Sequence, residues 1–203
     1  FNADLFAVSR NLDYLESHIC FEKYALGDVL ERSDERLGDA DEPEVLTCTE
    51  SGGLILQRER FAKRVATVDA SKYKIVRMGD IVYNPYLLWK GSIDQCWIVD
   101  LGITSPAYEI LRVRSGFDPT VIGQIVTSPE MVRRYDGISF GTVQRRRRAP
   151  VEKFLELEIN VPSHKHIAIL SKLMKSAQES QYASRNAERA IKELLKALTR
   201  QLR

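Results

Sequence analysis

The stretch GDIVYN, residues 79–84, begins the part of the sequence that decides the fold. It leads into a loop rich in glycine, proline, tryptophan and tyrosine, after which the chain continues as AYEILRV over residues 107–113. Both runs are apolar and strand-like, and the alternation in the second is typical of a half-buried strand. The pattern predicts strands at 81–83 and 107–113 that flank a loop built to present surface.

The flanking sequence predicts a mixed α/β (α+β) domain around these strands. Asp118 before Pro119, and Ser128 before Pro129, indicate helix starts, because the first side chain can cap the helix and proline fits the first helical position. Further strands are predicted over 45–49, 54–56 and 154–161, the last ended by Pro162. Helices are predicted over 1–23 and 58–66. Residues 24–32 are predicted to form a small helix or a strand–helix junction.

The sequence pattern over residues 163–203 predicts one long helix. From His164 onward the sequence has no proline or glycine, and Ser163 can cap the start. Roughly 40 residues at ~1.5 Å each would extend about 60 Å. Heptad spacing predicts an antiparallel coiled coil and dimerisation through Ile167, Leu170, Met174, Ala177, Ile191, Leu195, Leu198 and Leu202. The alternative is a helix that lies along its own domain. We therefore divide the chain into a globular domain, 1–162, and a spacer helix, 163–203.

Composition limits the class of protein. The chain has 203 residues, and its longest apolar runs are too short for a membrane span. Cys20, Cys48 and Cys96 are odd in number and far apart, which fits reduced thiols of a cytoplasmic protein better than disulfides or a zinc site. The first residue is Phe1 rather than Met, which leaves room for an upstream segment.

The net charge of +2 conceals an asymmetry along the chain. Residues 1–60 hold 6 basic and 14 acidic side chains, residues 61–163 hold 15 and 11, and residues 164–203 hold 9 and 3. The chain is thus acidic in its N-terminal part and basic in its central and C-terminal parts. This distribution is typical of a protein that binds a polyanion on one face. Solvated helix surface is the alternative for the tail.

An arginine run is the sharpest electrostatic feature of the sequence. It consists of Arg145, Arg146, Arg147 and Arg148. Four successive guanidinium groups repel one another, and a phosphate backbone relieves that repulsion while counterions are released. Arginine also reads guanine edges, and Thr142 and Gln144 just before the run can meet base edges. The run therefore predicts DNA contact, and a solvated basic loop is the alternative.

Other residues are weaker candidates for a DNA interface. Lys63, Arg64 and Lys90 can supply phosphate contacts, although exposed basic side chains are common on any surface. Tyr83, Asn84 and Trp89 are placed near DNA or in the core.

The tripeptide at 84–86, Asn-Pro-Tyr, partly matches the loop with which adenine methyltransferases bind a flipped base. The second proline of that loop and a cofactor-binding glycine loop are missing, so no catalytic residue is predicted. No metal site is predicted either.

Three blocks of the sequence carry a resemblance to a known family. They are GDIVYN at 79–84, WKGSI at 89–93 and GITSPAY at 102–108. In this order they resemble the target-recognition domain of type I restriction-modification specificity (S) subunits. Residues 153–162, followed by a long helix, resemble what comes next in that family. The match extends from about Leu26 to the end of the chain.

The resemblance implies a non-catalytic DNA-specificity subunit of a cytoplasmic phage-defence system. Such a subunit reads half of a split double-stranded DNA target and uses long antiparallel helices as a spacer. It docks methyltransferase subunits, which hold S-adenosylmethionine, and indirectly the restriction motor subunit. The chain itself needs no cofactor in this interpretation.

Size departs from the family, because a full specificity subunit usually has two recognition domains and two long helices. The chain can therefore be half of a homodimer, a split subunit or a fragment. A second hypothesis is the C-terminal recognition domain of a fused adenine methyltransferase-endonuclease. A third is a coiled-coil interaction module with no DNA role.

Overall fold

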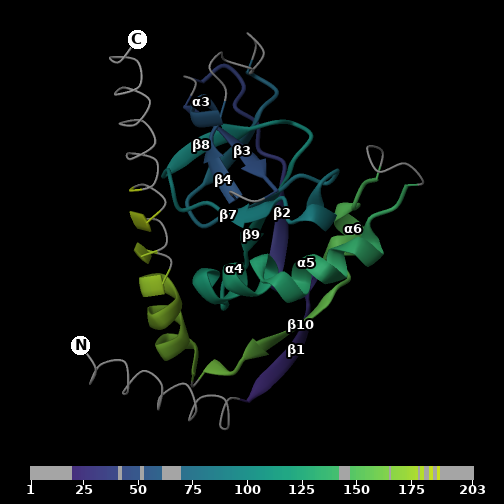
Figure 1. The fold of residues 1–203 in the computed structure, drawn as a ribbon, viewed down its shortest axis with the longest axis vertical. Helices are drawn as coiled ribbons and strands as arrows, with labels where there is room; N and C mark the ends of the chain where they lie inside the picture. Colours follow the sequence, from purple (N-terminus) through teal and green to yellow (C-terminus); the bar gives the residue numbers. More distant parts are fainter. Residues whose placement is uncertain are drawn as a thin grey trace, which may run out of the picture.

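The computed structural model describes the globular part of the chain and the start of the C-terminal helix. The described residues are 20–40, 43–50, 53–60, 70–141, 147–164, 166–177, 179, 180, 183, 184 and 187. Two four-stranded sheets and one two-stranded sheet, together with short helices, form this part (Figure 1). The predicted mixed α+β fold is confirmed.

The central sheet is antiparallel and contains both strands that the sequence places at the centre of the fold. Its order is β2 (Leu30–Ser33), β9 (Glu109–Val113), β6 (Ile81–Tyr83) and β7 (Ile93–Gln95). The outer sheet has the order β4 (Gly53–Leu56), β3 (Glu44–Thr49), β8 (Leu101–Thr104) and β5 (Lys74–Arg77), with β3 and β8 parallel. The segment between β6 and β9, predicted as a loop, therefore contains two strands and the 3-10 turn η1 (Leu88–Lys90).

Alternation along β6 distributes its side chains between two hydrophobic cores. Ile81 and Tyr83 belong to the larger core, which the central sheet forms with the helices. Val82 points the other way and packs with residues of the outer sheet such as Leu46 and Val76. All three β6 side chains are fully buried. The central sheet is thus a middle layer, with helices on one face and the outer sheet on the other.

Two capped helices cover the central sheet, as the sequence predicts. They are α4 (Pro119–Thr127) and α5 (Pro129–Tyr135). The Asp118 carboxylate accepts a hydrogen bond from Val121 N at 3.0 Å, and the Ser128 hydroxyl accepts one from Met131 N at 3.3 Å. Each cap satisfies a backbone donor that has no partner inside the helix. A 3-10 turn, η2 (Asp136–Ile138), follows α5.

The prediction of a strand over 154–161 is wrong in its first half. Residues 151–155 form the helix α6 (Val151–Leu155), and the strand β10 spans Glu158–Pro162. Val151 and Phe154 are buried one helical turn apart. Leu155, at the end of this helix, continues the alternation of Leu157, Ile159 and Val161, and the alternation was therefore extended too far toward the N-terminus. Pro162 lies at the end of β10, opposite Phe21. A proline is tolerated there because both strands of a two-stranded sheet are edges.

The N-terminal part of the described chain is a strand–helix–strand unit. It comprises β1 (Phe21–Ala25), which pairs with β10, then α2 (Leu26–Val29) and β2. The junction predicted over 24–32 is confirmed, whereas residues 21–23 are strand rather than helix. The helix predicted over 58–66 begins as α3 (Gln57–Arg60), and its remainder lies outside the described residues.

The C-terminal helix begins where the sequence predicts. Residues 164 and 166–177 are helical, and this segment leans against the globular part (Figure 1). Ile167, Leu170 and Met174 of the predicted seam are partly buried and Ala177 is exposed, while Ile169 and Leu173 expose apolar side chains. The remaining seam residues lie outside the described part of the chain: Ile191, Leu195, Leu198 and Leu202. In the described residues no helix is long and apolar enough to cross a membrane.

Candidate nucleic-acid interface

Residues 84–90, here called the aromatic loop, form a compact turn at the end of β6. The Asn84 side chain accepts a hydrogen bond from Tyr86 N at 3.0 Å, which closes the first bend. Trp89 Nε1 donates to Tyr86 O at 3.3 Å, so the indole lies back over the loop. Gly91, with φ of +86°, ends the turn in the left-handed region that favours glycine. The loop holds Tyr86 exposed and Trp89 half-buried.

The segment on either side of the arginine run lies against the aromatic loop. Phe140 and Arg148 exchange two backbone hydrogen bonds, at 3.0 and 2.8 Å, so the chain goes out and returns beside itself. Ala149 N donates to Pro85 O at 2.8 Å and ties the returning strand to the aromatic loop. The structure thus brings together two of the stretches that the sequence singled out. The excursion itself, residues 142–146, lies outside the described residues, and with it Thr142, Gln144, Arg145 and Arg146.

The Arg147 side chain points inward and anchors this part of the chain to the globular domain. Its guanidinium lies 4.7 Å from the Trp89 ring centre, pairs with the Asp136 carboxylate at 2.8 Å and donates to Ser139 O. Only 20% of the side chain is exposed. Of the predicted DNA contacts, Arg147 is thus turned toward the protein, with Nε and Nη2 bonded to Ser139 and Asp136.

Arg148 points to the other side and stays accessible. Its side chain is 55% exposed, and the guanidinium lies 4.0 Å from Glu109 Oε1 and 5.9 Å from the Tyr86 ring centre. Lys90 is also exposed, 3.4 Å from Glu50 and 5.2 Å from the Trp89 ring centre. Arginine, lysine and aromatic faces together are groups that contact phosphates and stack on bases. Lys63 and Arg64 are outside the described residues.

Tyr83, predicted to lie either near DNA or in the core, is a core residue and not an exposed DNA contact. It is fully buried and stacks on Phe154, with ring centres 4.9 Å apart. Burial, with a contribution from the Glu109 carboxylate, raises the pKa of its phenol well above the usual value. Among the described side chains, its hydroxyl is a buried polar atom with no hydrogen-bond partner. Such an atom costs free energy that a phenylalanine would not.

Tyr83→Phe is therefore expected to leave the free energy of unfolding unchanged or to raise it by about 1 kcal/mol. Tyr135→Phe is the matched comparison, because the Tyr135 hydroxyl is also buried but donates to Val126 O at 2.7 Å. That variant leaves a carbonyl near the end of α4 without its partner and should lose about 1–2 kcal/mol. Urea denaturation measures both. Equal losses in the two variants would contradict the difference seen in the structure.

Three residues at or beneath this surface were not among the predicted site residues. They are Arg32, Tyr86 and the buried Glu109. Arg32 and Glu109 form a two-point ion pair, with nitrogen–oxygen distances of 2.9 and 3.2 Å. A signal was present, because Glu109 is a lone carboxylate within an apolar strand, and a buried charge requires a partner. The sequence does not show that Arg32 is the partner of Glu109, because the two residues are 77 positions apart along the chain.

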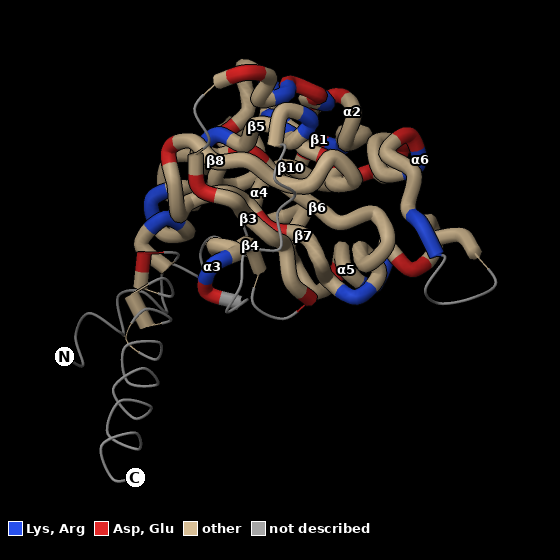
Figure 2. The backbone as a smooth tube through the Cα atoms, turned by 90° about the horizontal axis from the view of Figure 1, so that it is seen from above, with Lys and Arg blue, Asp and Glu red and all other residues tan. Residues whose placement is uncertain are grey.

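Charge is distributed more evenly than the sequence asymmetry suggests. Figure 2 shows Lys and Arg interspersed with Asp and Glu over the globular part, rather than gathered on one broad basic face. The charge asymmetry along the sequence therefore does not appear as one basic face of the described residues in this view.

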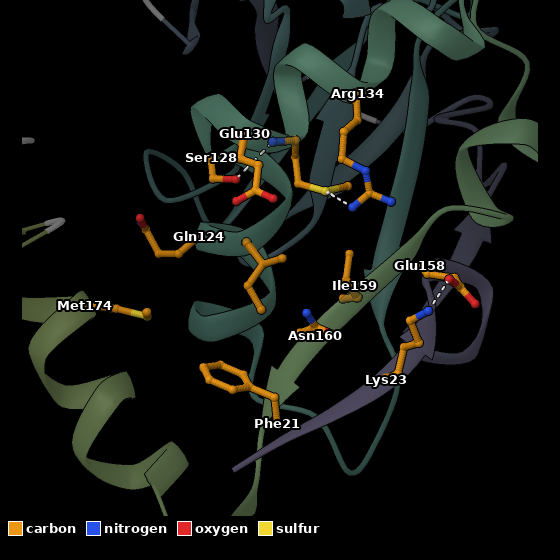
Figure 3. Close-up of a pocket in the computed structure, with 12 residues that line it drawn as sticks. Phe21, Lys23, Gln124, Ser128, Glu130, Arg134, Glu158, Ile159, Asn160 and Met174 are labelled. Atoms are coloured by element: carbon orange, nitrogen blue, oxygen red, sulfur yellow. Dashed lines mark hydrogen bonds and ion pairs between the residues drawn. The ribbon is translucent and has the colours of Figure 1, made fainter. Parts of the chain in front are cut away.

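A groove lies on another side of the molecule, beside the C-terminal helix. Its volume is about 660 Å³, and it is bounded by the β1–β10 pair, α4, α5 and Met174 (Figure 3). The ion pair of Lys23 and Glu158 lies at one end, and Phe21 lies exposed on β1. Met174, a residue of the predicted partner seam, thus faces its own domain. This placement favours the alternative in which the first helical turns lie along the globular part.

Groups for covalent or metal chemistry are not assembled in the described part. No cluster of three or more His, Cys, Asp or Glu side chains there could hold a metal ion. All three cysteines are free. Burial raises the pKa of the Cys48 thiol to about 12 and that of Cys96 to about 11, so neither is a thiolate nucleophile at neutral pH.

Comparisons with known proteins identify the fold. No protein-family model matches the sequence, and no curated protein matches it. A type I restriction-modification S subunit from M. genitalium matches in structure, with 14% identity, a TM-score of 0.52, and coverage of 82% of this chain and 42% of that chain.

Two further solved structures match less closely. The HsdS subunit from Thermoanaerobacter tengcongensis has 17% identity and a TM-score of 0.49, over 86% of this chain and 47% of that one. A chain from a study of the assembly and conformational transition of the type I R-M system has 12% identity and a TM-score of 0.49, over 88% and 43%. The chain thus spans less than half the length of each structure it matches.

The fold is that of a type I restriction-modification S subunit over most of this chain. The resemblance carried by the three sequence blocks is confirmed at this level.

Proposed function

We propose that this chain supplies DNA sequence specificity within a type I restriction-modification assembly. The observation that carries the proposal is the convergence of the aromatic loop and the arginine run into one surface on an S-subunit fold. Arg148, Lys90 and Tyr86 are exposed there. Groups of this kind contact phosphates, while a loop beside them can enter a groove and read base edges.

In this proposal the chain reads one half of a split double-stranded target. The C-terminal helix extends from the globular part and sets the distance to a second half, either another copy or another recognition domain. Methyltransferase subunits dock on the assembly and carry out the S-adenosylmethionine chemistry, and the restriction motor subunit associates through them. The chain itself binds and positions, without a catalytic role. Coverage of less than half of each S subunit it matches fits one recognition unit.

Binding to duplex DNA at several salt concentrations tests the DNA role directly. Arg145, Arg146 and Arg148 are changed to alanine together, while Arg147 is kept because it fastens the base of the excursion. We expect the slope of log affinity against log salt to flatten by about 0.9 for each phosphate that the variant no longer binds. Lys23→Ala, which removes an exposed charge from the distant β1–β10 pair, should leave the slope unchanged. An unaltered slope in the triple variant would remove the arginine run from the interface.

The assembly role needs a separate experiment. Co-purification with the methyltransferase encoded beside it, followed by mapping of methylated sites across the genome, would reveal the partner and the target. A fused methyltransferase-endonuclease remains the second candidate from sequence, and the full gene separates the two, because a fusion would encode a cofactor-binding motif upstream.

A further inference from the structure

Glu109 is a buried carboxylate on which cations converge from three different parts of the chain. Its side chain is only 4% exposed. Arg32 from β2 approaches it at 2.9 Å, Lys74 from β5 at 3.6 Å, and Arg148 from the end of the arginine run at 4.0 Å. Both Arg32 and Arg148 reach the same oxygen, Oε1, with their Nη2 atoms. Both guanidinium groups therefore lie within 4.0 Å of one carboxylate oxygen.

The charges of this group do not balance. Besides Glu109, the only other carboxylate that the described residues contribute is Asp34, which pairs with Lys74 at 2.9 Å and with Arg36 at 3.2 Å. Four cations thus share two carboxylates.

A neighbouring network provides the comparison. There Arg77 and Arg112 are matched by Glu35 and Asp80, two cations against two carboxylates. The excess of positive charge is specific to the group around Glu109.

The excess positive charge lies at the surface, where a ligand can reach it. The Arg32 side chain is 43% exposed and that of Arg148 is 55% exposed, whereas Lys74 is only 3% exposed. Arg32 uses Nε and Nη2 on Glu109, which leaves Nη1 without a partner among the described residues. Arg148 has no side-chain hydrogen bond to the described part of the protein. Two guanidinium groups with unused donors near one carboxylate form a site for an anion.

We propose that Arg32 and Arg148, which both approach Oε1 of Glu109, bind one phosphate of the DNA backbone. Glu109 is a positioning residue in this site, because its carboxylate holds the Arg32 guanidinium with two hydrogen bonds and attracts that of Arg148 at 4.0 Å. Arginine suits a phosphate because its planar fork offers two parallel N–H donors to two oxygens. The exposed Tyr86 ring beside Arg148 provides a flat face for the adjoining sugar or base.

The proposal rests on the proposed DNA role and makes it more specific. The base of the excursion would anchor the backbone, while the residues at its tip would be free to read bases. Because a phosphate contact carries no sequence information, the site should act on any duplex. It can therefore be tested without knowing the target sequence.

The test uses the full chain and a short duplex of arbitrary sequence, with affinity measured over a range of salt concentrations. Arg148→Ala and Arg32→Lys are the variants. The first removes an exposed side chain with one distant ionic partner, and the second keeps the charge but loses the fork. Lys23→Ala is the charge-matched control. Circular dichroism and thermal unfolding establish that each variant is folded.

We expect Arg148→Ala to weaken binding about tenfold and to flatten the salt slope by about 0.9, and Arg32→Lys to weaken binding with little change in slope. In the double variant, the fold-loss of DNA affinity should be smaller than the product of the two separate fold-losses, since both side chains bind one phosphate. Affinity and slope equal to those of Lys23→Ala in both variants would overturn the site, while leaving the DNA role intact. Absence of any duplex binding by the unaltered chain would instead overturn the DNA role itself.

Inorganic phosphate is the second probe, because it offers the same oxygens without a nucleic acid. At matched ionic strength with chloride, we expect phosphate to raise the melting temperature of the unaltered chain more than that of Arg148→Ala. A rise that disappears in Arg148→Ala, while that variant binds the duplex as tightly as the unaltered chain, would assign the site to free phosphate and overturn its assignment to the DNA backbone.

Discussion

Replacing Glu109 with alanine is expected to lower the free energy of unfolding by about 3 kcal/mol. The substitution removes a partner of Lys74, which the fold keeps buried, and the partner of Arg32, which is partly exposed. Lys74 is 3% exposed and would keep only Asp34, and Arg32 would lose both of its hydrogen bonds to the carboxylate. Breaking a buried ion pair on one side is costly because the remaining charge stays desolvated. Urea denaturation, with the slope of the transition compared between variants, measures the loss.

Glu158→Ala is the matched control for this prediction. Glu158 also pairs with a lysine, at 2.6 Å, but both side chains are more than half exposed. An exposed pair of this kind contributes between 0 and about 1 kcal/mol. Glu109→Gln separates charge from shape, and should fall between the unaltered chain and the alanine variant. If Glu109→Ala cost no more than Glu158→Ala, the carboxylate would not be the electrostatic centre that the structure indicates.

Local features of the fold could be predicted from sequence because neighbouring residues determine them. The caps at Asp118 and Ser128 depend on one side chain and the backbone three residues later, and both occur as predicted. The strands β3, β4 and β6 follow from short runs of apolar and β-branched residues. The error over 154–157 has a local origin too, because a short helix followed by a strand leaves apolar residues at positions that satisfy both periods.

The arrangement of the candidate site could not be predicted, because it depends on contacts between distant segments. The sequence offered four equivalent arginines in a row. In the fold, Arg147 meets Trp89 and Asp136 and is used internally, while Arg148 turns to Glu109 and remains accessible. Nothing in the run itself distinguishes the two. Alternation along an extended segment puts neighbours on opposite sides, but only the strands around it decide which side is buried.

Replacing Gly123 with alanine is expected to cost about 3 kcal/mol, at the upper end of what overpacking a core usually costs. Gly123 lies within α4, where an added Cβ would overlap the side-chain amide of Gln95. That amide cannot move aside easily. Its Nε2 donates to Gly79 O and Pro119 O, both at 2.9 Å, and its Oε1 accepts from Trp97 Nε1 at 3.1 Å. Either these hydrogen bonds break inside the core or α4 moves away from β7.

Gly137→Ala is the matched control, because an added Cβ there meets nothing within 4 Å. Its unfolding free energy should stay within about 0.5 kcal/mol of the unaltered chain. In a Gln95→Ala background the overlap is gone. There, Gly123→Ala should lower the free energy of unfolding much less than it does in the unaltered chain. A full additional loss in the double variant would show that the amide is not the obstacle. The outcome also bears on DNA binding, since α4 supports α5, and α5 packs against the turn that carries Trp89. A shift of α4 should therefore weaken duplex binding as well as stability.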